Sequence, residues 1–213
     1  MKQPAIAMDR VGVIFGKKDV LSAFSLQVDA GEKVCLRGPS GSGKSTVLRC
    51  LLGLVVPREG EIQIGTETLT AQSVWRLRSH MAWAPQEPDW GGLTVREALE
   101  RPFAYRVNRA LAPSTSRIAE SMERLDLSPT LLEQPTADLS GGEKQRLSLV
   151  AALLLDRSIL LLDEVTSALD EANRQRVRET LTNLRDTTVL AVSHDAEAET
   201  WAQRVIAMEG DHA

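Results

Sequence analysis

The chain has 213 residues, of which 43% are hydrophobic and 25% are charged, and its formal net charge is −4. This is the composition of an ordinary globular protein, and the length suits one α/β domain with a sizeable core. The slightly acidic balance excludes a basic field that would draw the protein to nucleic acid or anionic lipid, so no nucleic-acid partner is expected.

No stretch of the sequence is long and apolar enough to cross a bilayer. The longest apolar run, LSLVAALLL at 147–155, is far shorter than the roughly 18–20 residues that a spanning helix needs. The first ten residues also lack the continuous apolar core of a signal peptide. Cys35 and Cys50 lie in apolar segments without metal-ligand spacing, which favours buried, reduced thiols. The sequence therefore predicts a soluble, cytoplasmic protein.

The first third of the chain predicts short strands followed by a glycine-rich loop. Strands are expected at 5–15, 24–28 and 33–37. The run GPSGSGKST at 38–46 follows the third strand, and apolar residues at helical spacing after it predict a helix that continues to about Val55. Two more short strands are expected before residue 85, at 61–64 and 81–84.

The middle of the chain differs from both ends. Residues 93–139 combine short helical patterns with several prolines, which predicts a small helical subdomain inserted into the α/β body. From residue 141 the pattern alternates in the order helix, strand, helix, strand, over 142–156, 159–162, 171–185 and 188–192. Both of these strands are continuous apolar runs, as expected for parallel strands that are buried on both faces of a sheet.

The glycine-rich loop satisfies the pattern G-x-x-x-x-G-K-[ST] between a strand and a helix, which is the context in which this pattern binds nucleotide phosphates. Glycines let successive backbone N–H groups turn toward the phosphates, and the helix N-terminus adds its positive dipole. Lys44 supplies a mobile charge to the β- and γ-phosphates, and the hydroxyl of Ser45 ligates Mg²⁺. The nucleotide-binding residues predicted in this loop are Gly38, Pro39, Ser40, Gly41, Ser42, Gly43, Lys44, Ser45 and Thr46.

Polar side chains follow three of the predicted strands. Asp163 and Glu164 end the strand at 159–162, and neighbouring side chains of an extended segment point in different directions. We therefore assign Asp163 to the Mg²⁺ shell, and Glu164 to the attacking water as general base. His194 follows the last strand and would bond the γ-phosphate or Glu164, with a helix cap or a surface position as the alternative. Gln86 follows an earlier strand, and a loop glutamine on its own indicates little.

Taken in order, these pieces resemble the motifs of ATP-binding-cassette (ABC) ATPases. The chain contains segments similar to six motifs of that family: Walker A (GPSGSGKST), the Q-loop (Gln86 in APQ), the signature (LSGGEKQR, 139–146), Walker B (ILLLDE, 159–164), the D-loop (SALD, 167–170) and the switch histidine (His194 in VSHD). The resemblance covers essentially the whole chain and implies an ATPase that uses ATP and Mg²⁺. It implies catalytic roles for Lys44, Gln86, Glu164 and His194, and metal ligation by Ser45, Gln86 and Asp163.

The resemblance also implies a fold. We expect an α/β P-loop ATPase fold with a mixed β-sheet core, an N-terminal antiparallel β subdomain and an inserted α-helical subdomain. One domain would span 1–213, in which 1–86 and 141–213 form the catalytic core and 87–140 form the helical subdomain with the signature motif. Phe15 lies 29 positions before Lys44, which suits the aromatic residue that stacks on adenine in this family. A packed strand residue is the alternative for Phe15.

In this family two cassettes associate head to tail, and this gives LSGGE a role that a single chain does not reveal. Ser140, Gly141 and Gly142 of one chain would contact the γ-phosphate that Lys44 of the other chain holds. The physical basis is again a nest of N–H groups at a helix N-terminus. The expected functional unit is an ATP-dependent homodimer.

Two classes of cassette protein remain open. The chain is either the ATPase subunit of a transporter, docked on a separate permease at the cytoplasmic face of the inner or plasma membrane, or a non-transport ATPase that acts on a protein or nucleic-acid complex. The absence of a second cassette and of a long coiled-coil insertion, together with the net acidity, favours the transporter subunit. A P-loop kinase is a weaker third possibility, because it would lack LSGGE and would need a phosphoryl acceptor site.

The segment EPDWGGLTVREAL at 87–99 resembles the stretch of the family that receives a permease helix. Trp90 within it either faces the permease or packs in the core of the helical subdomain. The motifs look most like those of the small Fet-type subunits, which implies iron or metal export, with lipid export and small-solute import as alternatives. Because the chain ends soon after the last expected strand, no C-terminal regulatory domain is expected.

Overall fold

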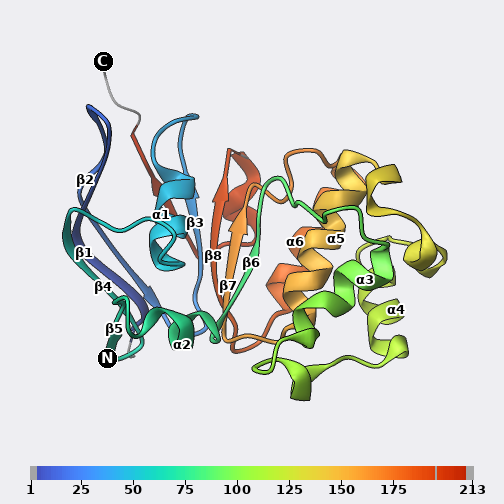
Figure 1. Cartoon of the computed structure of the whole chain (residues 1–213). Coiled ribbons are helices and arrows are strands. Elements are labelled where there is room, and N and C mark those ends of the chain that lie inside the picture. Colours follow the sequence, from blue (N-terminus) through green and yellow to red (C-terminus); the bar gives the residue numbers. More distant parts are fainter. Residues whose placement is uncertain (1–3, 195, 210–213) are drawn as a thin grey trace.

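The computed structural model describes residues 4–194 and 196–209, in which two β-sheets and two groups of helices are arranged along the molecule (Figure 1). The first sheet is antiparallel, with the strand order β2–β1–β4–β5. Its strands are β1 (Pro4–Phe15), β2 (Lys18–Asp29), β4 (Glu59–Ile64) and β5 (Glu67–Thr68). This sheet contains the strands expected at 5–15, 24–28 and 61–64, whereas the strand expected at 33–37 belongs to the second sheet.

The second sheet is parallel, with the order β6–β7–β8–β3–β9. Its strands are β3 (Lys33–Arg37), β6 (Met81–Ala84), β7 (Ile159–Asp163), β8 (Thr188–Ser193) and β9 (Arg204–Ala207). Every residue of β7 and β8 is buried, because helices cover both faces of this sheet. The parallel arrangement brings the carboxyl ends of β3, β7 and β8 to one edge of the sheet.

The helices divide between the two faces of the parallel sheet. On one face α1 (Lys44–Leu51) packs with the antiparallel sheet, and α2 (Val74–Arg78) precedes β6. On the other face lie α3 (Val95–Glu100), α4 (Thr115–Arg124), α5 (Gly141–Leu154) and α6 (Glu171–Asn183). Short 3₁₀ helices occupy the connections: η1 (Arg101–Ala104), η2 (Arg109–Leu111), η3 (Pro129–Glu133), η4 (Thr136–Asp138) and η5 (Ala196–Thr200).

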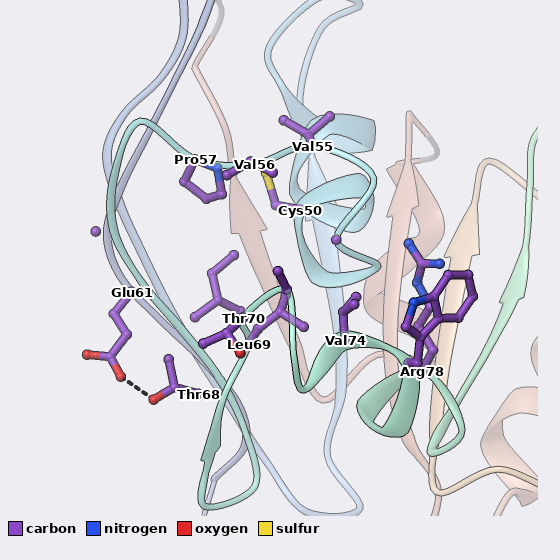
Figure 2. A pocket seen from close by; sticks show the side chains of 15 residues that line it. Cys50, Val55, Val56, Pro57, Glu61, Thr68, Leu69, Thr70, Val74 and Arg78 are labelled. Atoms are coloured by element: carbon purple, nitrogen blue, oxygen red, sulfur yellow. Dashed lines mark hydrogen bonds between the residues drawn. The ribbon is translucent and has the colours of Figure 1, made fainter.

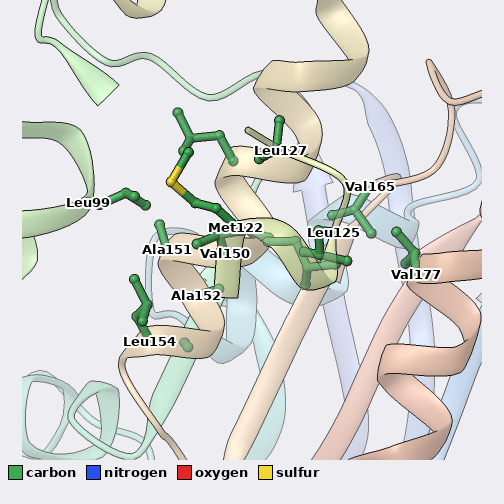
Figure 3. Packing of buried hydrophobic residues seen from close by; sticks show 14 of the residues in the cluster. Leu99, Met122, Leu125, Leu127, Val150, Ala151, Ala152, Leu154, Val165 and Val177 are labelled. Atoms are coloured by element: carbon green, nitrogen blue, oxygen red, sulfur yellow. The ribbon is translucent and has the colours of Figure 1, made fainter. Parts of the chain in front are cut away.

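Because side chains alternate along the buried strands, they contribute to two separate hydrophobic cores. In β7, Leu160 and Leu162 join the core beneath α3–α6, whereas Leu161 joins the core shared with α1 and the antiparallel sheet. Figure 3 shows the first core, to which Met122 of α4 and Val150 of α5 both belong. A continuous apolar strand is therefore needed here, since each side of it faces a different hydrophobic layer.

The helix α5 starts where the signature-like sequence predicts a helix N-terminus. Ser140 is its N-cap, and the hydroxyl of Ser140 accepts a hydrogen bond from the backbone N–H of Glu143 at 3.3 Å. The Glu143 carboxylate in turn accepts from the N–H of Ser140 at 2.8 Å, which completes a capping box. The Ser140 hydroxyl also donates to the Glu143 carboxylate at 2.7 Å, and this bond, together with the one from the Ser140 N–H, keeps the pKa of the Glu143 carboxyl below its usual value. The turn that precedes α5 is therefore held in place locally.

The predicted α/β architecture is confirmed, with an antiparallel sheet that contains the N-terminal strands and a group of helices inserted between β6 and β7. Both strand directions are present because one sheet is antiparallel and the other parallel. Some elements differ from expectation. The helix α1 ends at Leu51 rather than near Val55, and β2 begins at Lys18 rather than Phe24. Residues 87–140 contain helices and no named strand, and the division of the chain at 86/87 and 140/141 stays a prediction.

Candidate functional site

The glycine-rich loop connects β3 to α1 at the carboxyl edge of the parallel sheet. Gly43, the N-cap of α1, has φ = 90°, and a Cβ there would lie 2.7 Å from the carbonyl oxygen of Val20. A Cβ on Gly38 would lie 2.2 Å from the carbonyl oxygen of Met208. The first position needs glycine for its left-handed backbone and both need it for close backbone approach, so the loop can wrap tightly around a ligand.

Lys44 turns its side chain back over this loop. Its Nζ donates hydrogen bonds to the carbonyl oxygens of Gly38 at 2.9 Å and Pro39 at 2.7 Å. Burial lowers the pKa of the Lys44 ammonium, while the nearby carboxylates of Glu164 and Asp163 act in the opposite direction. A polyphosphate entering the loop would offer this ammonium stronger acceptors than the two neutral carbonyls.

Ser45 and Asp163 form a second polar pair beneath the loop. The Ser45 hydroxyl donates to Asp163 Oδ1 at 2.8 Å. Asp163 is the last residue of β7 and is only 3% exposed. Burial raises the pKa of its carboxyl, with a smaller raising contribution from Glu164, against the hydrogen bond from Ser45 and the charges of Arg49 and Lys44. A buried carboxylate beside a hydroxyl provides the hard oxygen donors that Mg²⁺ prefers.

Glu164 comes directly after β7, and its carboxylate has different partners from that of Asp163. The backbone of Glu164 has φ = 51°, in the left-handed region that residues other than glycine seldom adopt. Its carboxylate accepts a hydrogen bond from Gln86 Nε2 at 2.8 Å and lies 2.6 Å from His194 Nε2. Strain of this kind is typical of functional sites, and three predicted site residues meet here from separate parts of the sequence.

A cavity of about 320 Å³ connects these groups. The predicted residues that line it are Phe15, Ser40, Gly41, Gly43, Lys44, Ser45, Thr46, Gln86, Glu164 and His194. Phe15 is 49% exposed, so its ring stands at the rim and is not packed in a core. The hydroxyl of Ser42 is buried and has no hydrogen-bond partner among the described residues. A large aromatic surface at one end and a phosphate loop at the other suit a nucleoside polyphosphate.

Two residues that line this cavity, Lys18 and Val20, were not predicted from the sequence. Both belong to β2, which pairs with the strand that carries Phe15. The only signal for Lys18 is its position three residues after that aromatic side chain, and no motif includes it.

The signature turn lies elsewhere on the molecule. Ser140, Gly141 and Gly142 do not line the cavity around Lys44, and Ser140 and Gly141 are exposed to solvent. The structure therefore separates these three predicted phosphate contacts from the phosphate loop of their own chain. A Cβ on Gly142 would lie 3.2 Å from the carbonyl oxygen of Ala168, so the D-loop-like segment packs closely against the start of α5.

A second, more apolar pocket of about 510 Å³ lies between α1, β4, β5 and α2 (Figure 2). Val55, Pro57, Leu69 and Val74 border it, and burial raises the pKa of the Cys50 thiol at its wall to about 11. None of the predicted nucleotide-site residues lines this pocket. Its chemistry does not suit polyphosphate.

Within residues 4–194 and 196–209, no helix is long and apolar enough to cross a membrane. The same residues contain no cluster of three or more His, Cys, Asp or Glu side chains that would hold a metal ion unaided. A metal at Ser45 and Asp163 would therefore need further oxygen ligands from the nucleotide phosphates and water, which is how Mg²⁺ is usually bound at nucleotide sites.

Comparison with known proteins agrees with this geometry. The family model for ABC transporters matches residues 21–167. The energy-coupling factor transporter ATP-binding protein EcfA1 of Leuconostoc mesenteroides is 33% identical over 215 residues, which cover 95% of this chain and 76% of that protein. The "Probable iron export ATP-binding protein FetA" of Escherichia coli K12 is 34% identical over 209 residues, with 97% and 92% covered.

Solved structures with the same fold include transporter components. The dimeric structure of a bacterial ABC transporter cassette is 28% identical, with a TM-score of 0.82 over 96% of this chain and 94% of that chain. An ATP-bound bacterial Atm1-family ABC exporter is 25% identical with a TM-score of 0.81, and this chain spans 37% of it. Because the family model covers more than half of the chain, and because EcfA1 and FetA match along most of their length, the chain belongs to the ABC transporter family, as a nucleotide-binding ATPase subunit.

Proposed function

We propose that this ATPase subunit hydrolyses ATP at Glu164, with Gln86 and His194 as the groups that orient its carboxylate. The observation that carries the proposal is the pair of contacts on that carboxylate, at 2.8 Å from Gln86 Nε2 and 2.6 Å from His194 Nε2, beside the cavity that contains Lys44. Glu164 accepts a proton from the attacking water, and Lys44 offsets negative charge on the phosphates. Phe15 provides the surface on which the base stacks.

The residues present fit a Mg²⁺ ion. Ser45 Oγ and Asp163 Oδ1 are hard oxygen donors 2.8 Å apart at the base of the phosphate loop. Gln86 contacts Glu164 through its amide nitrogen, so its carbonyl oxygen is the atom with which it would join this ligand set. When bound, the ion supplies positive charge that stabilises the phosphate oxygens during phosphoryl transfer. Asp163 and Ser45 keep the ligand oxygens oriented.

We infer a head-to-tail homodimer as the functional unit. Support comes from the location of Ser140, Gly141 and Gly142, which lie outside the nucleotide cavity of their own chain at an exposed helix N-terminus. The N-terminus of a 14-residue helix carries a partial positive charge that attracts phosphate. In the proposed dimer this helix end completes the partner's ATP site. The dimeric cassette with a similar fold is a further argument for this arrangement.

For the permease contact we propose the region 87–99, which would place the subunit at the cytoplasmic face of the membrane. Trp90 is half-buried and packs against the core, so the packing alternative holds for this side chain. Gly91 and Gly92 next to it are exposed with positive φ. A groove of about 550 Å³, to which Leu93 and Glu97 contribute, borders the same segment and offers an apolar surface to a permease helix.

We propose that the transporter to which this subunit belongs exports a metal ion. The chain spans 92% of the "Probable iron export ATP-binding protein FetA" but 76% of EcfA1 of Leuconostoc mesenteroides, at nearly equal identity. The alternative is a non-transport ABC ATPase that acts on a protein or nucleic-acid complex. Copurification of the native protein from membranes separates the two, because a multi-span membrane protein as the stoichiometric partner supports transport, whereas ribosomes or DNA would overturn it.

The test of the catalytic proposal is Glu164→Gln. Loss of the general base should lower kcat by about 100-fold or more while ATP binding is retained. With ATP the variant should accumulate as a dimer in size-exclusion chromatography, whereas the wild type with ADP should elute as a monomer. The matched control is Glu120→Gln, which neutralises an exposed carboxylate on α4 that does not line the nucleotide cavity and should leave the rate unchanged. A Glu164→Gln variant that turns over at the wild-type rate would exclude Glu164 as the base.

A further inference from the structure

Gln145 is a buried polar residue that does not line the nucleotide cavity. It lies in the second turn of α5 and is 6% exposed. Its amide crosses to the segment that follows β7: Nε2 donates to Ser167 Oγ at 2.8 Å and to the carbonyl oxygen of Glu164 at 3.4 Å, and Oε1 accepts from the N–H of Ala168 at 3.0 Å. Both ends of the amide are therefore engaged with one loop. If Gln145 only packed the helix against its neighbours, an apolar side chain of the same size would do so equally well.

The loop that Gln145 contacts carries the strained residue Glu164. The N–H of Glu164 donates to the carbonyl oxygen of Val192 at 3.0 Å. On the other side, the carbonyl oxygen of Glu164 accepts from the N–H of Ser167 at 3.1 Å and from the Ser167 hydroxyl at 3.0 Å. The same hydroxyl accepts from Gln145. Contacts on both sides of Glu164 thus hold its backbone at φ = 51°.

We propose that Gln145 is a positioning residue for Glu164. It fixes residues 164–168 against α5, and this keeps the Glu164 backbone in the left-handed conformation from which its carboxylate reaches Gln86 and His194. The proposal rests on the proposed role of Glu164 as general base. Without the Gln145 amide, the loop can relax toward an ordinary backbone conformation, and the carboxylate moves away from its partners. A displacement of about 1 Å is enough to cost on the order of 100-fold in rate.

This arrangement also joins two functional parts of one chain. The helix α5 begins at the signature turn, and Gln145 lies five positions after its N-cap, Ser140. Ala168 packs close to Gly142 in the same helix. The turn proposed to meet the partner's nucleotide and the carboxylate proposed to act on the chain's own nucleotide are therefore connected through one side chain.

The test uses Gln145→Met, which keeps side-chain length and removes the amide. We expect kcat to fall by about 10- to 100-fold, with the Kd for a fluorescent ATP analogue and the midpoint of thermal unfolding close to wild type. Ser167→Ala is a second variant, which removes the hydroxyl between Gln145 and the Glu164 carbonyl, and it should lower kcat in the same direction. Ser148→Ala is the matched control: it lies buried on the same helix and should leave kcat unchanged.

The decisive measurement is the effect of Gln145→Met in a Glu164→Gln background, followed by single-turnover hydrolysis. If Gln145 acts through Glu164, Gln145→Met should not lower the hydrolysis rate further in the Glu164→Gln background. The same fold-loss in both backgrounds, or an unchanged kcat in Gln145→Met and Ser167→Ala, would overturn the positioning role. A Glu164→Gln variant with wild-type turnover would instead contradict the proposed general base itself, so the two failures are distinguishable.

Discussion

Asp163 and Lys44 are charged side chains placed where burial disfavours their charge. Burial raises the pKa of the Asp163 carboxyl and lowers that of the Lys44 ammonium. For Asp163 the folded protein binds its proton more tightly than the unfolded chain does. The ionised Asp163 carboxylate therefore destabilises the folded protein. This destabilisation is absent at pH values well below the ordinary pKa of 3.8 and is complete at pH values above the raised pKa of the folded protein. The nucleotide-free site is destabilised at neutral pH, as is usual where residues are arranged for a charged ligand.

Asp163→Asn should therefore stabilise the protein without nucleotide while it weakens Mg²⁺-dependent ATP binding. The amide still accepts the hydrogen bond from Ser45 but carries no buried charge. A gain of about 1 kcal/mol corresponds to a rise of about 2–4 °C in Tm for a domain of this size. Differential scanning fluorimetry across pH checks it. The Tm difference should be largest near neutral pH and should shrink as the pH falls and Asp163 becomes protonated; a difference that grows at acidic pH would contradict the argument.

Among the helices, Arg146 of α5 forms hydrogen bonds to the end of α4 and to α6. Its guanidinium NH1 nitrogen donates to the carbonyl oxygens of Leu125 at 3.1 Å and Asp126 at 2.7 Å, beyond the end of α4, and to Asn173 Oδ1 in α6 at 2.8 Å. It also lies 3.6 Å from the Asp126 carboxylate. The arginine of LSGGEKQR is therefore a structural anchor that satisfies carbonyls which α5 would otherwise bury without donors.

Arg146→Met should lower the free energy of unfolding by about 3 kcal/mol, because it leaves the buried carbonyl of Leu125 and two partly buried acceptors without their donor. Urea denaturation with a common m-value measures this loss. Arg176→Met is the matched control, since Arg176 contacts the same Asp126 carboxylate at 3.6 Å from a half-exposed position, and it should cost less than about 1 kcal/mol. Equal losses in both variants would mean that the ion pair with Asp126 matters and the carbonyl contacts do not.

At the scale of the whole molecule, the phosphate loop and the signature turn occupy different places on one chain. Ser140→Arg should leave nucleotide affinity of the monomer intact, because Ser140 does not line the cavity around Lys44. The long cation should abolish ATP-dependent dimerisation and steady-state hydrolysis. Isothermal titration with an ATP analogue, together with size-exclusion chromatography, tests both halves of this expectation.

The substitution also removes the N-cap of α5, so it needs a control for capping alone. Ser114→Arg provides one, because Ser114 is the exposed N-cap of α4 and accepts from the N–H of Arg117 at 3.2 Å. It should cost a similar free energy of unfolding, about 1 kcal/mol, without affecting the dimer. Loss of nucleotide binding in the Ser140→Arg monomer would show that the signature turn serves its own chain.

Much of the nucleotide site could be predicted because its residues follow local patterns. Lys44 and Ser45 lie in a motif whose spacing depends on one strand, one loop and one helix, and Glu164 directly follows a buried strand. Lys18 and Gln145 could not be predicted in this way. Their roles depend on which segments the fold brings near the phosphate loop and Glu164, and no spacing along the chain encodes that.

Two further elements, β9 and α2, were not predicted from the sequence for the same reason. The strand β9 has only four residues, none of them fully buried, and it is defined by its pairing with β3. The helix α2 has five residues, of which only Leu77 is buried. Segments this short carry little periodic signal, and their conformation comes from the neighbours they pack against.

By itself, the sequence determined the fold class, the order of the motifs and the chemical type of each residue in the phosphate loop. Strand alternation and helix capping are local effects, so they are encoded within a few residues of each position. The sequence does not reveal that Gln86, Glu164 and His194 meet, that Gln145 contacts the loop after β7, or that Ser140 lies apart from Lys44, because these contacts form only in the folded chain. Those facts depend on the parallel order of five strands, which joins residues far apart in the chain at one edge of a sheet.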